Sequence, residues 1–109
     1  MSEDLRRVGH MVDCAQSIQQ YLKGRRRRLA TDRMLQDAVL RKFEVMGEAA
    51  AHVGAAFREA HPDVPWKRII AFRNVLIHAY DTIDLEHVQP AIEALPDVLK
   101  ALRQALGPS

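Results

Sequence analysis

The stretch WKRIIAFRNVLIHAY at residues 66–80 is the most informative part of this chain for its fold. Its apolar residues spread over nearly all faces of a helix, and they are Trp66, Ile69, Ile70, Ala71, Phe72, Val75, Leu76, Ile77 and Ala79. A helix that is apolar all round is covered on most of its sides. We therefore expect a helix from about Trp66 to Tyr80 that is largely buried, either in the core or at a contact between subunits.

Four polar side chains interrupt this apolar helix, namely Arg73, Asn74, His78 and Tyr80. Burying polar groups, and Arg above all, costs free energy unless they are paired, so their presence needs a reason. Asn74 and His78 are four residues apart and share a face. Arg73 and Tyr80 are seven apart and fall within about 20° of each other around the axis.

Arg73 and His78 are five positions apart, so within one copy they flank a ridge instead of facing each other. Two copies related by a twofold axis would bring two arginines and two histidines into one cleft. This geometry predicts a homodimer.

Such a cleft has the groups needed for metal-independent RNA cleavage, in which the ribose 2′-OH attacks the adjacent phosphate. The imidazole of His78 can take up or give a proton. Arg73 presents a permanently charged fork that matches phosphate oxygens, and Asn74 can position His78 or a phosphate. A satisfied polar network inside a helical bundle is the alternative interpretation of the same residues.

The segment upstream of this helix divides at His61-Pro62-Asp63-Val64-Pro65, where proline favours a break and then a new helical start. Before the break, apolar residues recur at helical spacing in two stretches. We expect one helix from a Ser2 cap to about Lys23, ended by Gly24, and a second from Thr31 or Asp32 to about Ala60.

Downstream, residues 81–84 form an expected turn in which Asp84 caps a last helix that runs to about Leu106. Pro96 lies deep enough in that helix to kink or split it. The whole pattern predicts an all-α, up-and-down bundle of four to five helices, with residues 1–109 forming one domain.

Composition sets the class of protein. Of 109 residues, 48% are hydrophobic and 28% charged, with a net charge of only +2, which is typical of a folded globular chain. The lone Cys14 cannot form an internal disulfide, and we expect it to be a structural thiol in a reducing cytoplasm. The polar start is unlike a secretory leader, and no apolar run approaches the length of a membrane helix.

Other candidate residues lie outside the 66–80 helix. The block Arg25, Arg26, Arg27 and Arg28 is either a solvated loop or a contact for RNA or a partner. Glu48 either orients Arg73 or His78, or makes a solvent-facing or bundle salt bridge. His10, His52, His61 and His87 have no metal-ligand spacing, and no glycine-rich phosphate loop is present, so we expect no metal and no cofactor.

The octapeptide RNVLIHAY at 73–80 resembles the R-N-x-x-x-H-x-Y signature of HepT-like HEPN proteins. The segments QDAV at 36–39 and GEAA at 47–50 are similar to parts of that family's long second helix. PDVPW at 62–66 resembles its connector, and Asp84-Leu85 its restart after the motif.

This resemblance implies a homodimeric helical bundle that acts as the toxin of a toxin–antitoxin pair. It implies that Arg73 and His78 are the ribonuclease residues, with Asn74 in support. It also implies that an MntA-like nucleotidyltransferase antitoxin attaches AMP to Tyr80, where the added bulk and negative charge would block RNA. A non-catalytic RNA-binding or partner-binding module paired with a nucleotidyltransferase is the alternative function, and packing is the alternative role for Tyr80.

Overall fold

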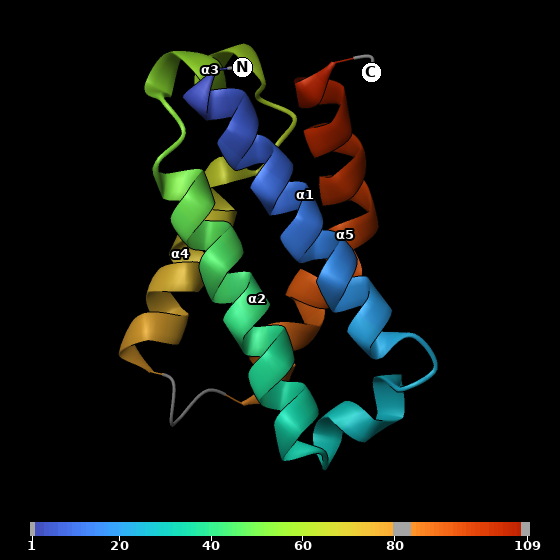
Figure 1. Ribbon diagram of the computed structural model, residues 1–109. Coiled ribbons are helices and arrows are strands. Elements are labelled where there is room, and N and C mark those ends of the chain that lie inside the picture. The colour runs from blue at the N-terminus through green and yellow to red at the C-terminus, as the bar shows by residue number, and fades with distance from the viewer. Residues whose placement is uncertain (1, 80–83, 108–109) are drawn as a thin grey trace.

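The computed structural model describes residues 2–79 and 84–107, and within them the chain is helical without strands. The elements are α1 (Glu3–Leu22), the short 3₁₀ helix η1 (Arg26–Ala30), α2 (Arg33–Ala51), α3 (Ala55–Ala60), α4 (Trp66–His78) and α5 (Leu85–Leu106). The four long helices run alternately down and up, and α3 crosses one end (Figure 1). The expected all-α, up-and-down bundle is confirmed.

Side-chain caps start three of the helices as the sequence predicts. Ser2 accepts a hydrogen bond from the backbone N–H of Leu5, and Asp32 accepts one from Leu35. Asp84 accepts one from Glu86 at the start of α5. These contacts satisfy N–H groups that the first helical turn leaves unpaired.

The core is apolar and centres on α1 and α2. α2 packs against both α1 and α4, while α1 also packs against α5. The predicted stripe of α1 is buried from Val8 to Leu22, and Leu5 is half-buried at its end. On α2 the apolar residues from Leu35 to Met46 are largely buried, whereas Met34 is 83% exposed.

The second predicted helix is two helices. α2 ends at Ala51, and α3 begins only at Ala55. The expectation of a continuous helix to Ala60 is wrong because Gly54 takes an extended conformation there, with its N–H donating to Asp4 Oδ1 at 2.9 Å. This bond ties the break to the start of α1.

One further expectation, for α5, is corrected. Pro96 does not split α5, which is one helix from Leu85 to Leu106. In the arginine block, Arg26, Arg27 and Arg28 lie in η1 after Gly24 reverses the chain at φ 71°, and all four arginines are exposed, so both alternatives for the block stay open. Among the described residues, no helix is both long and apolar enough to cross a membrane.

Candidate active site

The start of α4 is anchored in the core, and this fixes where its polar residues fall. Trp66 is buried, and its indole Nε1–H donates to the carbonyl of His61 at 3.0 Å. The ring of Phe57 packs edge-on against Trp66, with the ring centroids 6.3 Å apart. The polar residues Arg73, Asn74 and His78 lie in the other half of α4, away from this anchored start.

A close approach of α2 and α4 holds the stem of Arg73. A Cβ added at Gly47 would collide with Arg73 Cβ and would lie 2.9 Å from Arg73 Cγ. It would also lie 3.1 Å from the carbonyl oxygen of Ile69. Glycine at 47 thus permits the packing. α4 crosses α2 at the small-residue stretch GEAA, residues 47–50.

The guanidinium of Arg73 is held by two partners. Its Nη2 forms an ion pair with Glu48 Oε2 on α2, and its Nη1 donates to Asn74 Oδ1 at 2.9 Å. The side chain is only 25% exposed, and its Nε is buried without an acceptor among the described residues. Two directional contacts of this kind fix the plane of the fork.

Glu48 therefore contacts Arg73 and not His78. The contact fits both alternatives that the sequence leaves open, since it is a salt bridge between helices and also a restraint on the Arg73 guanidinium. Asn74 accepts a hydrogen bond from Arg73 through its carbonyl oxygen, and a role in positioning His78 or a phosphate stays a prediction.

His78 is the last residue of α4, and it is exposed, as is Asn74. Helix geometry separates it from Arg73 by about 140° around the axis. Within the described part of the chain no hydrogen bond joins the two side chains. In one copy the Arg73 and His78 side chains therefore point in different directions from α4, as their spacing predicts. Tyr80, the fourth polar residue of the motif, lies outside the described residues.

The expectation that this helix is largely buried in the core is wrong. Only Trp66, Ile69 and Leu76 are buried in α4, whereas Val75 is 45% and Ile77 44% exposed. The bundle covers one side of α4, on α2, and leaves the opposite side open. A contact between subunits, the other alternative, stays a prediction.

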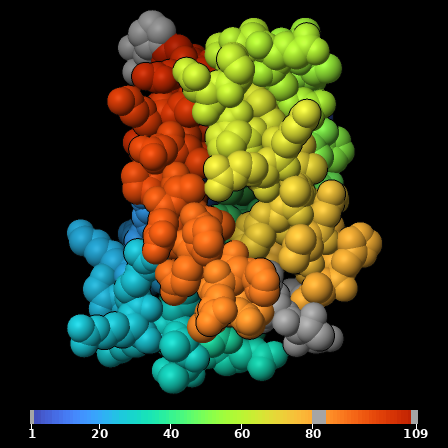
Figure 2. Space-filling model, turned by 180° about the vertical axis from the view of Figure 1, so that it is seen from behind, coloured from blue at the N-terminus to red at the C-terminus, as the bar shows by residue number. Residues whose placement is uncertain are grey.

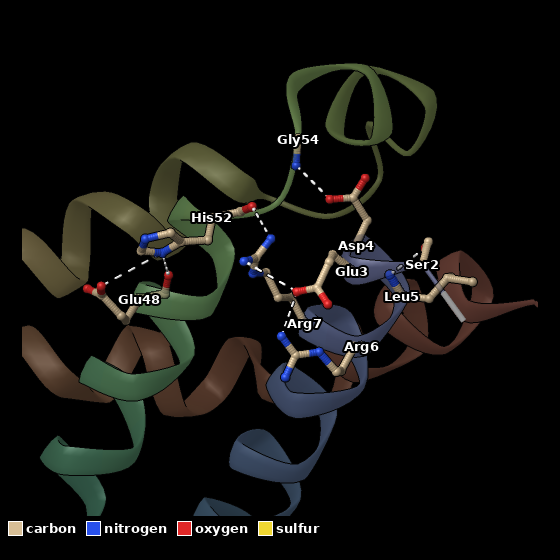
Figure 3. Close-up of polar contacts among 9 residues, drawn as sticks. All are labelled: Ser2, Glu3, Asp4, Leu5, Arg6, Arg7, Glu48, His52 and Gly54. Atoms are coloured by element: carbon tan, nitrogen blue, oxygen red, sulfur yellow. Dashed lines mark hydrogen bonds and ion pairs between the residues drawn. The ribbon is translucent and has the colours of Figure 1, made fainter.

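A second group of polar contacts adjoins Glu48 (Figure 3). His52 Nδ1 lies 2.9 Å from the backbone oxygen of Glu48 and 3.7 Å from its Oε1. Arg7 of α1 donates to the carbonyl of His52 at 3.0 Å and lies 3.6 Å from Glu3. A groove of about 890 Å³ borders Glu48, His52, Arg7 and His10.

Sequence reasoning did not link His52 or Arg7 to this region. The four-residue spacing from Glu48 to His52 on one helix was a signal that could have identified His52. Arg7 is 45 positions from His52, so only the packing of α1 on α2 brings it there.

The other candidates lie apart from Arg73. Arg26 donates to Gln89 Oε1 on α5 at 2.9 Å, and Arg25, Arg27 and Arg28 are exposed beside it. Cys14 is buried in α1, and desolvation raises the pKa of its thiol, which disfavours the reactive thiolate. These facts agree with a structural role for Cys14.

Known proteins similar to this chain point to one family. Residues 11–105 match the family described as Ribonuclease HepT-like. A Methanocaldococcus jannaschii protein named "Putative RNase" is 45% identical over 53 residues, which is 49% of each chain. "Probable ribonuclease HepT" of Thermococcus cleftensis is 39% identical over 54 residues, 50% of this chain and 49% of that one.

A "Putative RNase" of Caldanaerobacter subterraneus subsp. tengcongensis is 33% identical over 76 residues, 69% of this chain and 68% of the relative. The matched part spans about half the length of the Methanocaldococcus and Thermococcus proteins. No solved structure matches this chain. Because the family match runs from α1 to the end of α5, this chain belongs to the ribonuclease HepT-like family.

Proposed function

We propose that this protein is a metal-independent endoribonuclease and the toxin of a toxin–antitoxin pair. The family match and the names of its relatives support the ribonuclease class. The observation that carries the proposal is the arrangement at α4, where Glu48 and Asn74 hold the Arg73 guanidinium and His78 is exposed to solvent.

The chemistry is an internal phosphoryl transfer within RNA. The ribose 2′-oxygen attacks the neighbouring phosphorus, the bond from phosphorus to the 5′-oxygen breaks, and the products carry a 2′,3′-cyclic phosphate and a 5′-hydroxyl. His78 moves the proton, as base for the 2′-OH or as acid for the leaving oxygen. Arg73 retains N–H donors beyond those that bind Glu48 and Asn74, and these stabilise the charge on the phosphate.

We place this site at the contact of two copies. Val75 and Ile77 lie on either side of Asn74 and His78 around α4 and are 45% and 44% exposed. Covering them with the same face of a second chain would remove this apolar area from water. It would also bring the Arg73 of one copy toward the His78 of the other.

We further propose that an MntA-like nucleotidyltransferase acts as the antitoxin and attaches AMP to Tyr80. The bond would form between the tyrosine oxygen and the α-phosphorus of ATP, and pyrophosphate would leave. The support is the resemblance of residues 73–80 to the family signature, together with the position of Tyr80 seven residues after Arg73. The added phosphate would form an ion pair with the Arg73 guanidinium, so RNA phosphate could no longer bind there.

The test is cleavage of labelled RNA in EDTA by purified protein whose Tyr80 is shown by mass to be unmodified. We expect cutting by the unsubstituted protein and a loss of about 10² or more in rate for His78→Ala. Arg73→Lys keeps the charge but lacks the planar fork, so its rate should fall as well. His87→Ala, which removes an exposed histidine of α5, is the matched control and should cut normally.

Cutting that needs an added metal, or that survives in His78→Ala, would overturn the mechanism. If protein with confirmed unmodified Tyr80 binds RNA but does not cut it, the chain belongs to the alternative class, the non-catalytic RNA-binding modules.

A further inference from the structure

A groove lies between the C-terminal half of α1, η1 and the middle of α5. Its volume is about 660 Å³, and its polar lining is Gln16, Gln19, Gln20, Lys23, Arg26 and Arg103. Figure 2 shows the blue end of α1 and the cyan η1 segment beside the orange part of α5. No lining residue belongs to α4, so the groove is separate from the candidate active site.

A second hollow of about 550 Å³ continues this groove along α5. It shares Pro96 and Arg103 with the first and adds Lys100, Gln104 and Gly107. We call the two together the basic groove. It runs from η1 to the C-terminal end of α5.

The charge of the basic groove is of one sign. Its lining includes the cations Lys23, Arg26, Lys100 and Arg103 and no Asp or Glu among the described residues. The net charge of the whole chain is only +2, so this surface concentrates positive charge that carboxylates balance elsewhere. A concave surface with one sign of charge attracts polyanions.

The end of the groove at η1 is held in place by hydrogen bonds. Arg26 donates to Gln89 Oε1 on α5 at 2.9 Å, which bridges η1 to the far wall. Gln36 of α2 donates to the carbonyl of Leu29 at 2.8 Å, which ties η1 to the bundle. The arginine block therefore stands on a fixed element beside the groove.

We propose that the basic groove binds the phosphate backbone of single-stranded RNA, as a contact of the substrate away from the cleaved bond. This inference rests on the proposed ribonuclease function and adds a binding surface to it. It also gives the arginine block a role, since Arg25, Arg27 and Arg28 are exposed next to Arg26 and extend the positive surface.

The lining favours RNA over an acidic protein surface. Lys and Arg bind phosphate oxygens, and Gln side chains supply the neutral donors and acceptors that also contact phosphate and sugar. The groove has four glutamines beside its four cations, together with an apolar floor of Leu22, Ile92, Leu95 and Pro96 on which ribose and base can rest.

The experiment measures RNA binding in a His78→Ala background, so that the RNA is not cut. The groove variant is Lys23→Gln/Arg103→Gln, which leaves the Arg26 bridge intact. The matched control is Arg33→Gln/Arg41→Gln, which removes two exposed arginines of α2 outside the groove. Fluorescence anisotropy of labelled oligouridine gives the dissociation constant at several salt concentrations, and circular dichroism checks the helical fold.

We expect the groove variant to bind about tenfold more weakly at about 0.1 M salt. The slope of log affinity against log salt should become shallower by about 1.4, because each phosphate that the variant no longer neutralises accounts for about 0.7. The control should change by less than about twofold. Equal affinity and equal slope in the two variants would overturn the proposal.

Polyglutamate serves as a second probe of the same variants. If polyglutamate binding falls in the groove variant while oligouridine binding does not, the groove accepts an acidic protein and the proposal is wrong. Failure of the unsubstituted protein to cleave RNA is measured separately and concerns the active site alone. The two failures are therefore distinguishable.

Discussion

The side chain of Arg73 on α4 lies directly against the backbone of Gly47 on α2, where any Cβ would collide with it. Glu48, which follows Gly47 on α2, forms an ion pair with the Arg73 guanidinium. The packing of the two helices and the placement of the candidate catalytic cation are therefore one structural feature.

Replacing Gly47 by Ala should destabilise the protein by about 1–3 kcal/mol, because the new methyl group overlaps Arg73 and the Ile69 carbonyl lies close behind. Gly9→Ala is the matched control, since nothing lies within 4 Å of its added Cβ. It should stabilise α1 by about 0.5–1 kcal/mol. Urea unfolding measures both, and equal effects of the same sign would contradict the packing argument.

Glu48→Gln should lower the cleavage rate about tenfold, because Arg73 loses the charged partner that fixes its fork. The free energy of unfolding should change by less than about 1 kcal/mol, since the Glu48 side chain is 49% exposed. The loss should appear in kcat and leave KM little changed. The control is Glu44→Gln, which removes another paired carboxylate of α2 and should cut RNA normally. If Glu48→Gln loses stability and activity in parallel, the role of Glu48 is structural only.

The double variant Val75→Asp/Ile77→Asp should be a monomer in analytical ultracentrifugation and should not cleave RNA. The two new carboxylates, on either side of Asn74 and His78 around α4, would be buried unpaired at the proposed contact. Met34→Asp places one carboxylate on an exposed apolar residue at the start of α2 and should leave the dimer intact. A dimer that persists in the double variant would place the subunit contact elsewhere.

Tyr80→Phe should gain no AMP when incubated with ATP and the cognate nucleotidyltransferase, as measured by intact mass. The chain has two tyrosines, so Tyr21→Phe provides the control and should gain one AMP group. If Tyr80→Phe still gains AMP, or if Tyr21→Phe gains none, the modified residue is not Tyr80.

Stability should fall at alkaline pH because of Cys14. Burial raises the pKa of this thiol in the folded chain, so the unfolded chain releases its proton first. Below the unfolded-state pKa of about 8.5 both states hold the proton and no stability is lost. As pH rises from there through the folded-state pKa, the free energy of unfolding declines. Cys14→Ala should lack this part of the decline, and identical pH profiles of the two proteins would contradict it.

Local sequence was enough to predict the helical class and most helix boundaries. Capping side chains at Ser2, Asp32 and Asp84 act within one turn, so their effect depends only on neighbouring residues. The apolar stripe of α1 is likewise set by helical spacing. The sequence also placed Arg73, Asn74 and His78 on one helix, because the motif is contiguous.

What covers those residues depends on the tertiary structure. The end of α2 at Ala51 depends on a bond from Gly54 to Asp4, 50 positions away. The exposure of Val75 and Ile77 depends on which side of α4 meets α2, and helical spacing alone does not report that. The contact of Arg73 with Glu48 also depends on how α4 packs on α2. The residues are far apart in sequence, and a local sequence pattern does not determine how helices pack.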